Sequence, residues 1–218
     1  NNIEIIMQGD YFDETLKAAL EYSENTGAAM LPPFDHLDVI EGQASVGVEI
    51  LNQLESPPDM IITPVGGGGL SSGLVKYFNS YEIQFKFCEP MGGRSLFQSL
   101  KHKKVITLDY VDNFVDGAAV ARIGDQNFNI LKNQNIENVL GIPEGRICAT
   151  ITEMLNIEGI VLEPAGALAI DALKDIRDQI VGKTIVCIAS GGNFDFERLP
   201  DIKERALRFE GLKKYFIL

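Results

Sequence analysis

The sequence predicts an α/β protein with three layers, in which a mostly parallel sheet is covered by helices on both faces. Segments with strand character alternate with segments of helical periodicity along most of the 218 residues. Some of the strand segments, such as residues 60–65 and 183–189, are almost continuously apolar. Strands of that kind are typical of parallel sheets that are buried on both faces. The composition, 45% hydrophobic and 23% charged, suits one large domain or two small ones.

This alternation assigns each element in turn. We expect strands at residues 3–7, 28–31, 60–65, 83–88, 137–141, 157–162 and 183–189. We expect helices at residues 12–26, 37–54, 70–78 and 127–132, from residue 143 onward, and from residue 164 to about residue 177. Gly27 is typical of a helix end, while Pro143 and Pro164 suit a first helical turn because proline fixes φ.

Charge and cysteine content exclude several classes of protein. The formal net charge of −12 argues against a general nucleic-acid surface, and the basic run at residues 101–104 is interpreted as a solvated turn. No run of 18 apolar residues occurs, so no membrane span is expected. The three cysteines lack CxxC spacing, which indicates free thiols in a reducing cytoplasm rather than zinc or disulfide sites.

The strongest local signal is a run of four glycines, Gly66–Gly69, between an expected strand and an expected helix. Residues without Cβ atoms allow backbone N–H groups to converge where the helix dipole is positive. Such a loop favours the binding of an anion, most naturally a phosphate group. A tight structural turn is the alternative, although a turn seldom needs four glycines.

Two kinds of nucleotide-binding loop share this glycine-rich character. A Walker A loop is disfavoured, because Leu70 and two serines follow the glycines where that motif needs Gly-Lys-Ser/Thr. A dinucleotide-binding domain stays open as an alternative. Glu89 follows Gly69 by 20 residues, which is where an acidic residue would bind a ribose hydroxyl group.

Three other segments carry candidate site residues. Ser190 ends an expected strand, so its hydroxyl group is expected in the same crevice as the glycines, where it would be a weak hydrogen-bond partner for a ring nitrogen. Glu163 precedes an expected helix, where it either faces the site or complements the helix dipole. Asp35 is a candidate N-cap of the next helix, and His36 is more typical of a structural or exposed histidine than of a catalytic base.

Together these motifs resemble the threonine dehydratase group of pyridoxal-phosphate enzymes. Six motifs occur in the order that the group has, and the resemblance extends from about residue 3 to residue 208. They are Pro32-Pro33-Phe34-Asp35-His36, Gly66-Gly67-Gly68-Gly69-Leu70, Asp116-Gly117-Ala118-Ala119-Val120, Arg122-Ile123-Gly124-Asp125, Glu163-Pro164-Ala165-Gly166-Ala167-Leu168 and Ser190-Gly191-Gly192-Asn193. Within the group, the Pro-Pro-Phe-Asp-His motif and the tail from Phe194 resemble the biosynthetic threonine dehydratases.

The resemblance implies a fold, a cofactor and a set of site residues. The fold would be that of the tryptophan synthase β-like enzymes, and the cofactor would be pyridoxal 5'-phosphate. The Gly66–Gly69 run and the Leu70 amide group would hold its phosphate, and Ser190 would hydrogen-bond its pyridine nitrogen. The residues expected beside the cofactor ring or near the substrate entrance are Glu163, Gly117 and Phe34.

One motif of the group does not occur among the 218 residues. It is the Ser-x-Lys-x-Arg-Asn motif that supplies the Schiff-base lysine, so we assign no catalytic residue here and expect that lysine upstream of Asn1. The chain alone is therefore expected to be inactive. Related serine racemases bind a metal through an acidic pair around the position of Glu89. The second acidic residue is missing here, so no metal is expected.

The resemblance also predicts what the intact protein does. We expect dehydration and deamination of L-threonine to 2-oxobutanoate and ammonia, in isoleucine biosynthesis, by a cytoplasmic homo-oligomer of two or four chains. The alternatives are a serine dehydratase or serine racemase of the same group, and a non-catalytic nucleotide- or phosphate-binding domain. Residues 1–35 are expected to belong to a small domain, residues 36–203 to the large cofactor domain, and residues 204–218 to a linker towards a regulatory domain.

Overall fold

The computed structural model of the chain describes residues 3–9 and 12–216. The chain consists of two compact units, residues 1–33 and residues 34–218. The sheet and all the candidate site residues, from Phe34 onward, belong to the second unit.

The first unit contains the helix α1 (Phe12–Thr26), which has the predicted bounds. It ends at Gly27, whose left-handed φ of +73° directs its N–H group to the Ser23 carbonyl oxygen at 2.8 Å. The strands predicted at residues 3–7 and 28–31 are wrong, because neither segment forms a strand. A strand needs a partner for its backbone hydrogen bonds, and these runs pair with no other described segment of the unit.

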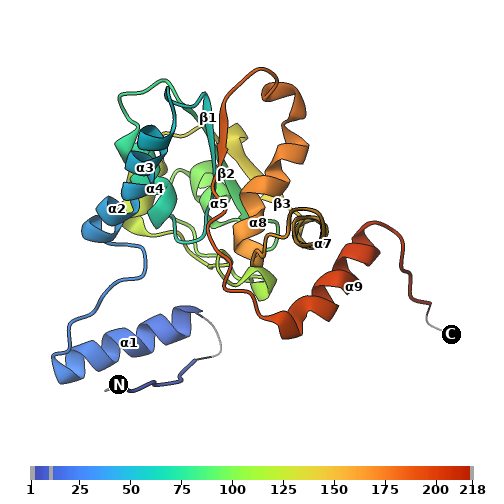
Figure 1. The fold of residues 1–218 in the computed structure, drawn as a ribbon. Helices are drawn as coiled ribbons and strands as arrows, with labels where there is room; N and C mark the ends of the chain where they lie inside the picture. The colour runs from blue at the N-terminus through green and yellow to red at the C-terminus, as the bar shows by residue number, and fades with distance from the viewer. Residues whose placement is uncertain (1–2, 10–11, 217–218) are drawn as a thin grey trace. The chain divides into compact units, whose positions relative to one another are not determined.

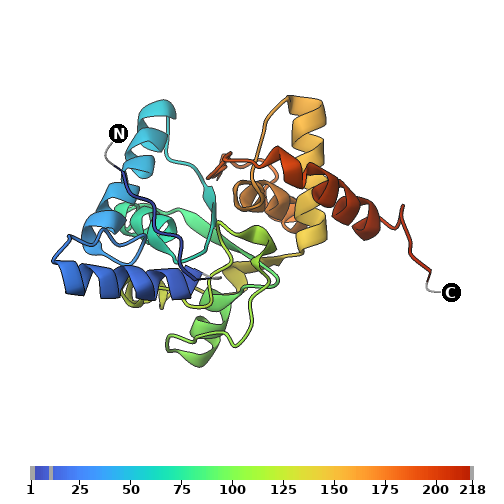
Figure 2. The ribbon, with the colours of Figure 1, turned by 90° about the horizontal axis from the view of Figure 1, so that it is seen from below.

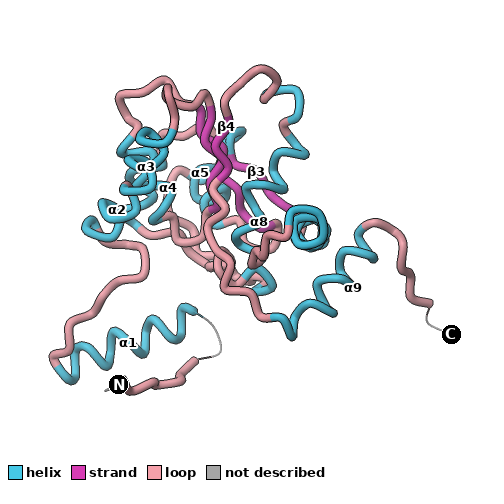
Figure 3. Tube along the Cα trace, viewed as in Figure 1, coloured by secondary structure: helices cyan, strands magenta, loops and turns pink. Residues whose placement is uncertain are grey.

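The second unit is built on a parallel sheet of four strands in the order β3-β2-β1-β4. Figure 3 draws the strands in magenta, among the helices of this unit. The strands are β1 (Met60–Pro64), β2 (Gln84–Pro90), β3 (Val139–Ile142) and β4 (Ile185–Cys187). All four overlap segments that the sequence predicts as strands, although β2 extends two residues and β3 one residue beyond the predicted ends. The central strand β1 pairs with β2 on one side and with β4 on the other, so Ile62 lies between Lys86 and Cys187.

Helices cover both faces of this sheet and complete the three layers (Figures 1 and 2). One face carries α2 (Leu37–Gln43), α3 (Ser45–Gln53), α4 (Gly69–Tyr77), α5 (Ser95–His102) and α6 (Asp125–Leu131). The other face carries α7 (Glu144–Glu153), α8 (Pro164–Asp171) and α9 (Leu199–Phe209). The predicted α/β class with helices on both faces is therefore confirmed.

Each face has its own apolar core, because side chains alternate along the strands. In β1, Met60 and Ile62 point towards α7 and α8, whereas Ile61 points towards α4. In β2, Phe87 belongs to the α4 face and Cys88 to the α8 face. Strands that are buried on both faces explain the continuous apolar runs in the sequence.

Three predicted segments of the second unit differ from the structure. The helix predicted from residue 164 to about residue 177 ends at Asp171, and a 3-10 turn, Ala172–Asp175, follows it. The helix predicted at residues 37–54 is divided by a turn at Ala44 into α2 and α3. The strand predicted at residues 157–162 is wrong. Its first residues extend α7 as a π-helical turn (Met154–Glu158), which ends at Gly159 with a φ of +67°. A short apolar run fits a strand or a helix equally well, so periodicity could not decide.

The remaining elements are short or were not predicted. Helices α5 and α9 are additional to the predicted ones. The 3-10 turns are Asn113–Val115, Ile136–Asn138, Ala172–Asp175, Arg177–Gln179 and Phe196–Arg198. Among the helices of the described residues, none has the length and apolar character that crossing a membrane would require.

Candidate cofactor site

The glycine run forms the connection between β1 and α4, at the carboxyl edge of the sheet. Gly68 is the N-cap of α4 and has a left-handed backbone with a φ of +94°, a conformation that glycine adopts without steric cost. The carbonyl oxygen of Gly68 accepts the N–H group of Ser72 at 2.9 Å and so begins the helix. The first amide groups of a helix lack partners within the helix and carry its positive dipole end.

The other glycines of the run are needed for close packing. A methyl group on Gly66 would lie 3.1 Å from the Ala118 Cα atom, and one on Gly67 would overlap the ring of Phe34. A methyl group on Gly69 would lie 3.2 Å from the Phe34 Cβ atom. The run is therefore bordered by Phe34 on one side and by the loop at Ala118 on the other. Steric packing alone thus accounts for glycine at these positions.

Helix α6 holds the glycine loop in place. The buried Asn127 side chain donates its Nδ2 group to the Gly67 carbonyl oxygen at 2.9 Å and to the Phe34 carbonyl oxygen at 3.1 Å. The Gly124 N–H group donates to the same Gly67 oxygen at 3.1 Å. These bonds direct the Gly67 carbonyl group towards α6. None of the sequence motifs includes Asn127, because a lone Asn in a helix carries no spacing signal.

Asp35 has a different role from the one the sequence predicts. Its carboxylate accepts the N–H groups of Asp125 and Gln126 at 2.9 Å each, at the amino end of α6. The N-cap of the following helix α2 is instead His36, whose Nδ1 atom accepts from Asp38 N–H at 3.3 Å. The prediction of Asp35 as that N-cap is therefore wrong. A cap bond across 90 residues depends on tertiary structure, and the sequence does not reveal it.

Ser190 follows β4, the strand that pairs with β1, and its side chain is exposed. The pairing of Ile62 with Cys187 places the two strand ends side by side, so Ser190 and the glycine loop leave the same edge of the sheet. Parallel α/β sheets typically bind ligands at this carboxyl edge, which is where the sequence predicts the site.

Glu163 lies at the start of α8 and faces the two neighbouring loops. A methyl group on Gly191 would overlap its carboxyl group, and one on Gly117 would lie 3.3 Å from its Oε1 atom. Its carboxyl group makes no cap bond to α8. Burial and the nearby Asp116 carboxylate raise the pKa of Glu163 above its ordinary value. A hydrogen bond from the Asn193 backbone has the opposite, smaller effect. This placement favours the hypothesis that Glu163 faces the site.

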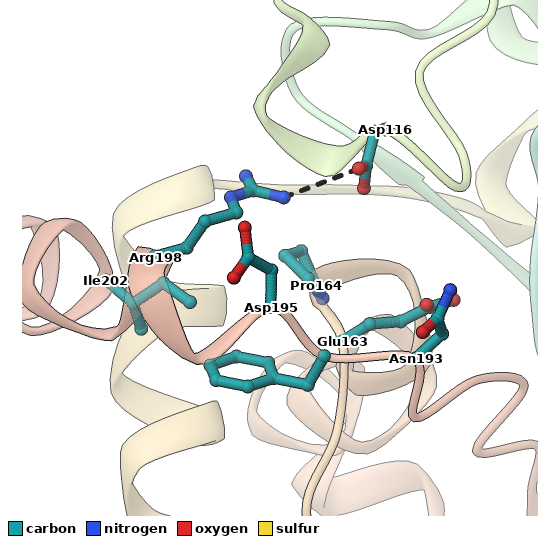
Figure 4. Close-up of a pocket in the computed structure, with 8 residues that line it drawn as sticks. Asp116, Glu163, Pro164, Asn193, Asp195, Arg198 and Ile202 are labelled. Carbon is teal, nitrogen blue, oxygen red and sulfur yellow. Dashed lines mark hydrogen bonds and ion pairs between the residues drawn. The ribbon is translucent and has the colours of Figure 1, made fainter.

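A small cavity of about 120 Å³ opens beside Glu163 (Figure 4). Its polar walls come from Asp116, Asn193, Asp195 and Arg198. The Arg198 side chain bridges from the segment after Asn193 to Asp116, with an Nη1–Oδ2 distance of 3.4 Å. Arg198 lies outside the six ordered motifs, in the tail from Phe194, and the sequence offers no signal for this contact.

Two buried charged residues of β2 make hydrogen bonds away from the glycine loop. Glu89 is fully buried, and its carboxylate accepts the N–H groups of Leu96 and Phe97 at 2.7 and 2.9 Å, at the start of α5. It therefore offers no group to a ribose, which removes the observation behind the dinucleotide hypothesis. The amine of Lys86 donates to Asn138 at 2.9 Å, before the start of β3, and burial lowers its pKa. That position is at the amino edge of the sheet, opposite to the glycine loop.

The residues at the carboxyl edge fit the phosphate and ring of pyridoxal phosphate. The amino end of α4 offers backbone amide donors, and Gly66 and Leu70 at the ends of the loop are half-buried rather than covered. A hydroxyl group, Ser190, and a carboxyl group, Glu163, lie on the neighbouring segments. The donor set therefore suits a phosphorylated aromatic ring.

The chain is similar to known threonine dehydratases over nearly its whole length. It is 45% identical, over 99% of its residues, to the biosynthetic L-threonine dehydratase of Bacillus subtilis (strain 168), and covers 51% of that protein. It is 43% identical to the corresponding enzyme of Staphylococcus aureus (strain bovine RF122 / ET3-1), covering 53% of it. The chain thus spans about half the length of the curated relatives it matches.

The chain is also similar to solved structures. The processed form of threonine deaminase isoform 2 from Solanum lycopersicum superposes with a TM-score of 0.84 at 36% identity, over 92% of this chain and 59% of that one. Maize serine racemase superposes with a TM-score of 0.80 at 27% identity, over 92% and 64%. The family described as "Pyridoxal-phosphate dependent enzyme" matches residues 2–191. The chain belongs to this family of pyridoxal-phosphate dependent enzymes.

Proposed function

We propose that the protein containing these residues is a threonine ammonia-lyase, which converts L-threonine to 2-oxobutanoate and ammonia as a step of isoleucine biosynthesis. One observation carries the proposal. The Gly66–Gly69 loop and the Ser190–Asn193 segment lie at the ends of neighbouring strands, in a chain that is 45% identical to a biosynthetic threonine dehydratase. Family membership supports the cofactor, and the relatives' names support the substrate.

Each site residue has a task in this proposal. When bound, pyridoxal phosphate supplies an electron sink that weakens the bonds at the amino acid's α-carbon. The amide groups of Gly66–Gly69 and Leu70, at the amino end of α4, bind the phosphate. The Ser190 hydroxyl group hydrogen-bonds the ring nitrogen and, unlike a carboxylate, leaves it largely unprotonated. That moderates the electron sink, which suits an elimination.

Three further residues border the ring and the substrate entrance in the proposal. Gly117 allows its loop to approach Glu163, so the carboxyl group and this loop can both lie beside the ring. The raised pKa of Glu163 makes its carboxyl group easier to protonate than an exposed one. Phe34 packs on Gly67 and covers one side of the phosphate loop, where it limits the access of water.

We further propose that the lysine to which the cofactor attaches is not among these 218 residues. The twelve lysines include none in a Ser-x-Lys-x-Arg-Asn setting. Lys86, whose lowered pKa favours the neutral amine, lies at the opposite edge of the sheet. The residues of this chain would then bind and orient the cofactor, and the intact protein would be needed for turnover.

The proposal includes the organisation of the protein. Residues 36–203 would form the cofactor domain, residues 1–35 would belong to a small domain, and residues 204–218 would be a linker. The intact protein would act in the cytoplasm as a homo-oligomer of two or four chains. Size-exclusion chromatography with light scattering measures the number of chains, and a monomeric active enzyme would contradict this part.

Turnover of the intact protein tests the function. We expect formation of 2-oxobutanoate from L-threonine, with a higher kcat/KM than for pyruvate formation from L-serine. Because the chain also resembles maize serine racemase in fold, the reaction with L-serine must be tested for D-serine by chiral analysis. A preference for L-serine, or accumulation of D-serine, would replace the proposal with a serine dehydratase or racemase.

Borohydride reduction tests the attachment. The 218-residue chain is mixed with pyridoxal phosphate, reduced and mapped by mass spectrometry, with inorganic phosphate as a competitor. We expect no stoichiometric label on any one lysine. Full labelling of Lys86 or any other single lysine would show that the chain carries its own attachment site. In the intact protein, the same procedure should label one lysine outside this chain.

A further inference from the structure

Arg198 connects two segments that both reach the candidate cofactor site. It ends the 3-10 turn Phe196–Arg198, which Asp195 caps by accepting the Glu197 N–H group at 2.9 Å. Its Nη2 atom donates to the Phe114 carbonyl oxygen at 2.7 Å, and its Nη1 atom lies 3.4 Å from the Asp116 carboxylate (Figure 4). The guanidinium group therefore holds two points of one loop.

That loop touches the site on two sides. A methyl group on Gly117 would lie 2.9 Å from the Ala165 Cβ atom and 3.3 Å from the Glu163 Oε1 atom. The next residue, Ala118, lies against Gly66 of the glycine loop. A displacement of this loop would therefore change the surroundings of both the glycine loop and Glu163.

We propose that Arg198 is a positioning residue, which fixes the Phe114–Ala118 loop relative to Glu163 and to the segment that carries Ser190. The inference rests on the proposed function, since it assigns Arg198 to the same cofactor site. Arg198 itself lines the cavity beside Glu163, and it acts through the loop rather than on the cofactor.

We call the two contacts of Arg198, with the Phe114 carbonyl oxygen and with the Asp116 carboxylate, the Arg198 clamp. The Phe114 contact contributes more to this clamp than the Asp116 contact does. The Asp116 side chain is 67% exposed, and an ion pair in that setting is screened by water. The Phe114 carbonyl bond is short, and Phe114 is buried. A charged donor to a buried carbonyl group is a stronger hydrogen bond than a neutral one. Lysine offers a single ammonium group and cannot hold both acceptors in the planar fork that arginine provides.

Arg198 also pairs with Asp116, the carboxylate that raises the pKa of Glu163. The groups that face this carboxyl group are Asp116 on the loop and the Asn193 backbone, with Arg198 and Asp195 across the cavity. The Asp116 carboxylate raises the pKa of Glu163, and Arg198 partly neutralises Asp116. Removal of the arginine charge should therefore raise the pKa of Glu163 further. Lysine at this position should restore the pKa but only part of the loop order.

Hydrogen–deuterium exchange on the apoprotein tests the clamp without any cofactor. Arg198→Ala should speed exchange in peptides from the 112–118 loop about tenfold or more, the effect of losing one charged hydrogen bond. The α4 peptides serve as the internal reference. Arg198→Lys should give an intermediate rate, and the exposed Arg177→Ala is the matched control. Unchanged exchange of the loop in both Arg198 variants would overturn the proposal. If Arg198→Ala does not fold, the exchange rates of the loop peptides in Arg198→Lys and Asp116→Asn are compared with those of the wild type instead.

A side-chain titration separates positioning from a merely structural role. Glutamate carboxyl groups are labelled with carbon-13, and the Glu163 signal is assigned with Glu163→Gln. We expect the midpoint of Glu163 to rise in Arg198→Ala and to stay near the wild-type value in Arg198→Lys. No movement in Arg198→Ala would count against the link between Arg198 and Glu163.

Titration with pyridoxal phosphate, followed by its absorption, then connects the clamp to the site. In the intact protein we expect Arg198→Ala to bind the cofactor several-fold more weakly than Arg177→Ala does. Equal affinity would overturn the assignment of Arg198 to the cofactor site. A wild-type protein that binds no pyridoxal phosphate would instead refute the proposed function, while the exchange result would still decide whether the clamp exists.

Discussion

The Asn127 side-chain amide donates to the Gly67 carbonyl oxygen at 2.9 Å, across 60 residues of sequence. A helix on one face of the sheet thereby fixes the orientation of the loop that the strand β1 presents. The same amide group holds the Phe34 carbonyl oxygen, so the residue that covers the loop and the loop itself share one anchor. Two of the six motifs are thus joined by a residue that belongs to none of them.

Asn127→Ala should loosen this anchor. The buried Gly67 carbonyl group and the half-buried Phe34 carbonyl group each lose a donor, so we expect a loss of about 1–3 kcal/mol in the free energy of unfolding and weaker binding of pyridoxal phosphate. Urea denaturation and a cofactor titration measure the two effects. Asn129→Ala, at an exposed position of the same helix, is the matched control and should change neither. Equal stability of both variants would show that the anchor contributes nothing.

Gly68→Ala should combine backbone strain with a steric conflict. The new Cβ atom would have a φ of +94° and lie 3.0 Å from the Asn127 Cβ atom. Gly182→Ala is the control, since it has a similar φ of +74° but open space around it. Strain alone costs about 1–3 kcal/mol, so both variants should lose stability in chemical denaturation. We expect a loss of cofactor affinity only in Gly68→Ala. If Gly182→Ala lost affinity equally, strain rather than loop geometry would be responsible.

Asp171→Asn should destabilise the face of the sheet that carries α7 and α8. The buried Asp171 carboxylate binds Arg146 Nε at 2.7 Å and the Thr150 hydroxyl group at 2.6 Å. Loss of its charge leaves Asp175 as the one ion-pair partner of Arg146 among the described residues, and breaking a buried pair costs about 3–5 kcal/mol. Thermal and urea unfolding measure the loss, with the exposed Asp178→Asn as control. A loss below that of the control would mean that the other contacts of Arg146 suffice.

Glu89 should make the stability of the protein depend on pH. Burial raises the pKa of Glu89 from 4.5 to about 7. The hydrogen bonds from Phe97 and Leu96 and the charge of Arg94 lower this pKa, but by less than burial raises it. The folded state therefore binds a proton that the unfolded state releases between about pH 4.5 and pH 7. By linkage, this group's contribution to stability falls as pH rises through that window and is constant above it. Denaturation midpoints measured across the window check the sign.

Glu89→Gln should flatten that pH dependence. The uncharged side chain cannot titrate, so the slope attributable to this residue disappears. The variant also loses one acceptor for the α5 amide groups and is expected to be less stable at every pH. Glu82→Gln, an exposed change near the start of β2, is the control for the slope. A variant slope equal to that of the wild type would assign the pH dependence to other groups.

Local signals predicted most of the second unit. Largely apolar runs predicted β1, β2, β3 and β4, because most side chains of strands buried on both faces are apolar. The buried Lys86 and Glu89 of β2 are exceptions that have hydrogen-bond partners. The glycine run and Ser190 were predicted at the same edge, since parallel strands end on the same side. The segments 3–7, 28–31 and 157–162 look equally apolar, but a strand forms only where a partner strand is available. Local composition does not contain that information.

The sequence by itself determined the class of the fold, the order of the motifs and the family. The class follows from periodicity, and the family follows from the resemblance of six ordered motifs to a known group, among them the glycine run that holds Gly68 with its positive φ. Tertiary structure alone decided that Asp35 caps α6, that Asn127 holds Gly67, and that Arg198 reaches Phe114. Each of these bonds joins side chains and backbone groups that are 60 or more residues apart. Only packing of the helices on the sheet brings such partners together, so no local pattern encodes them.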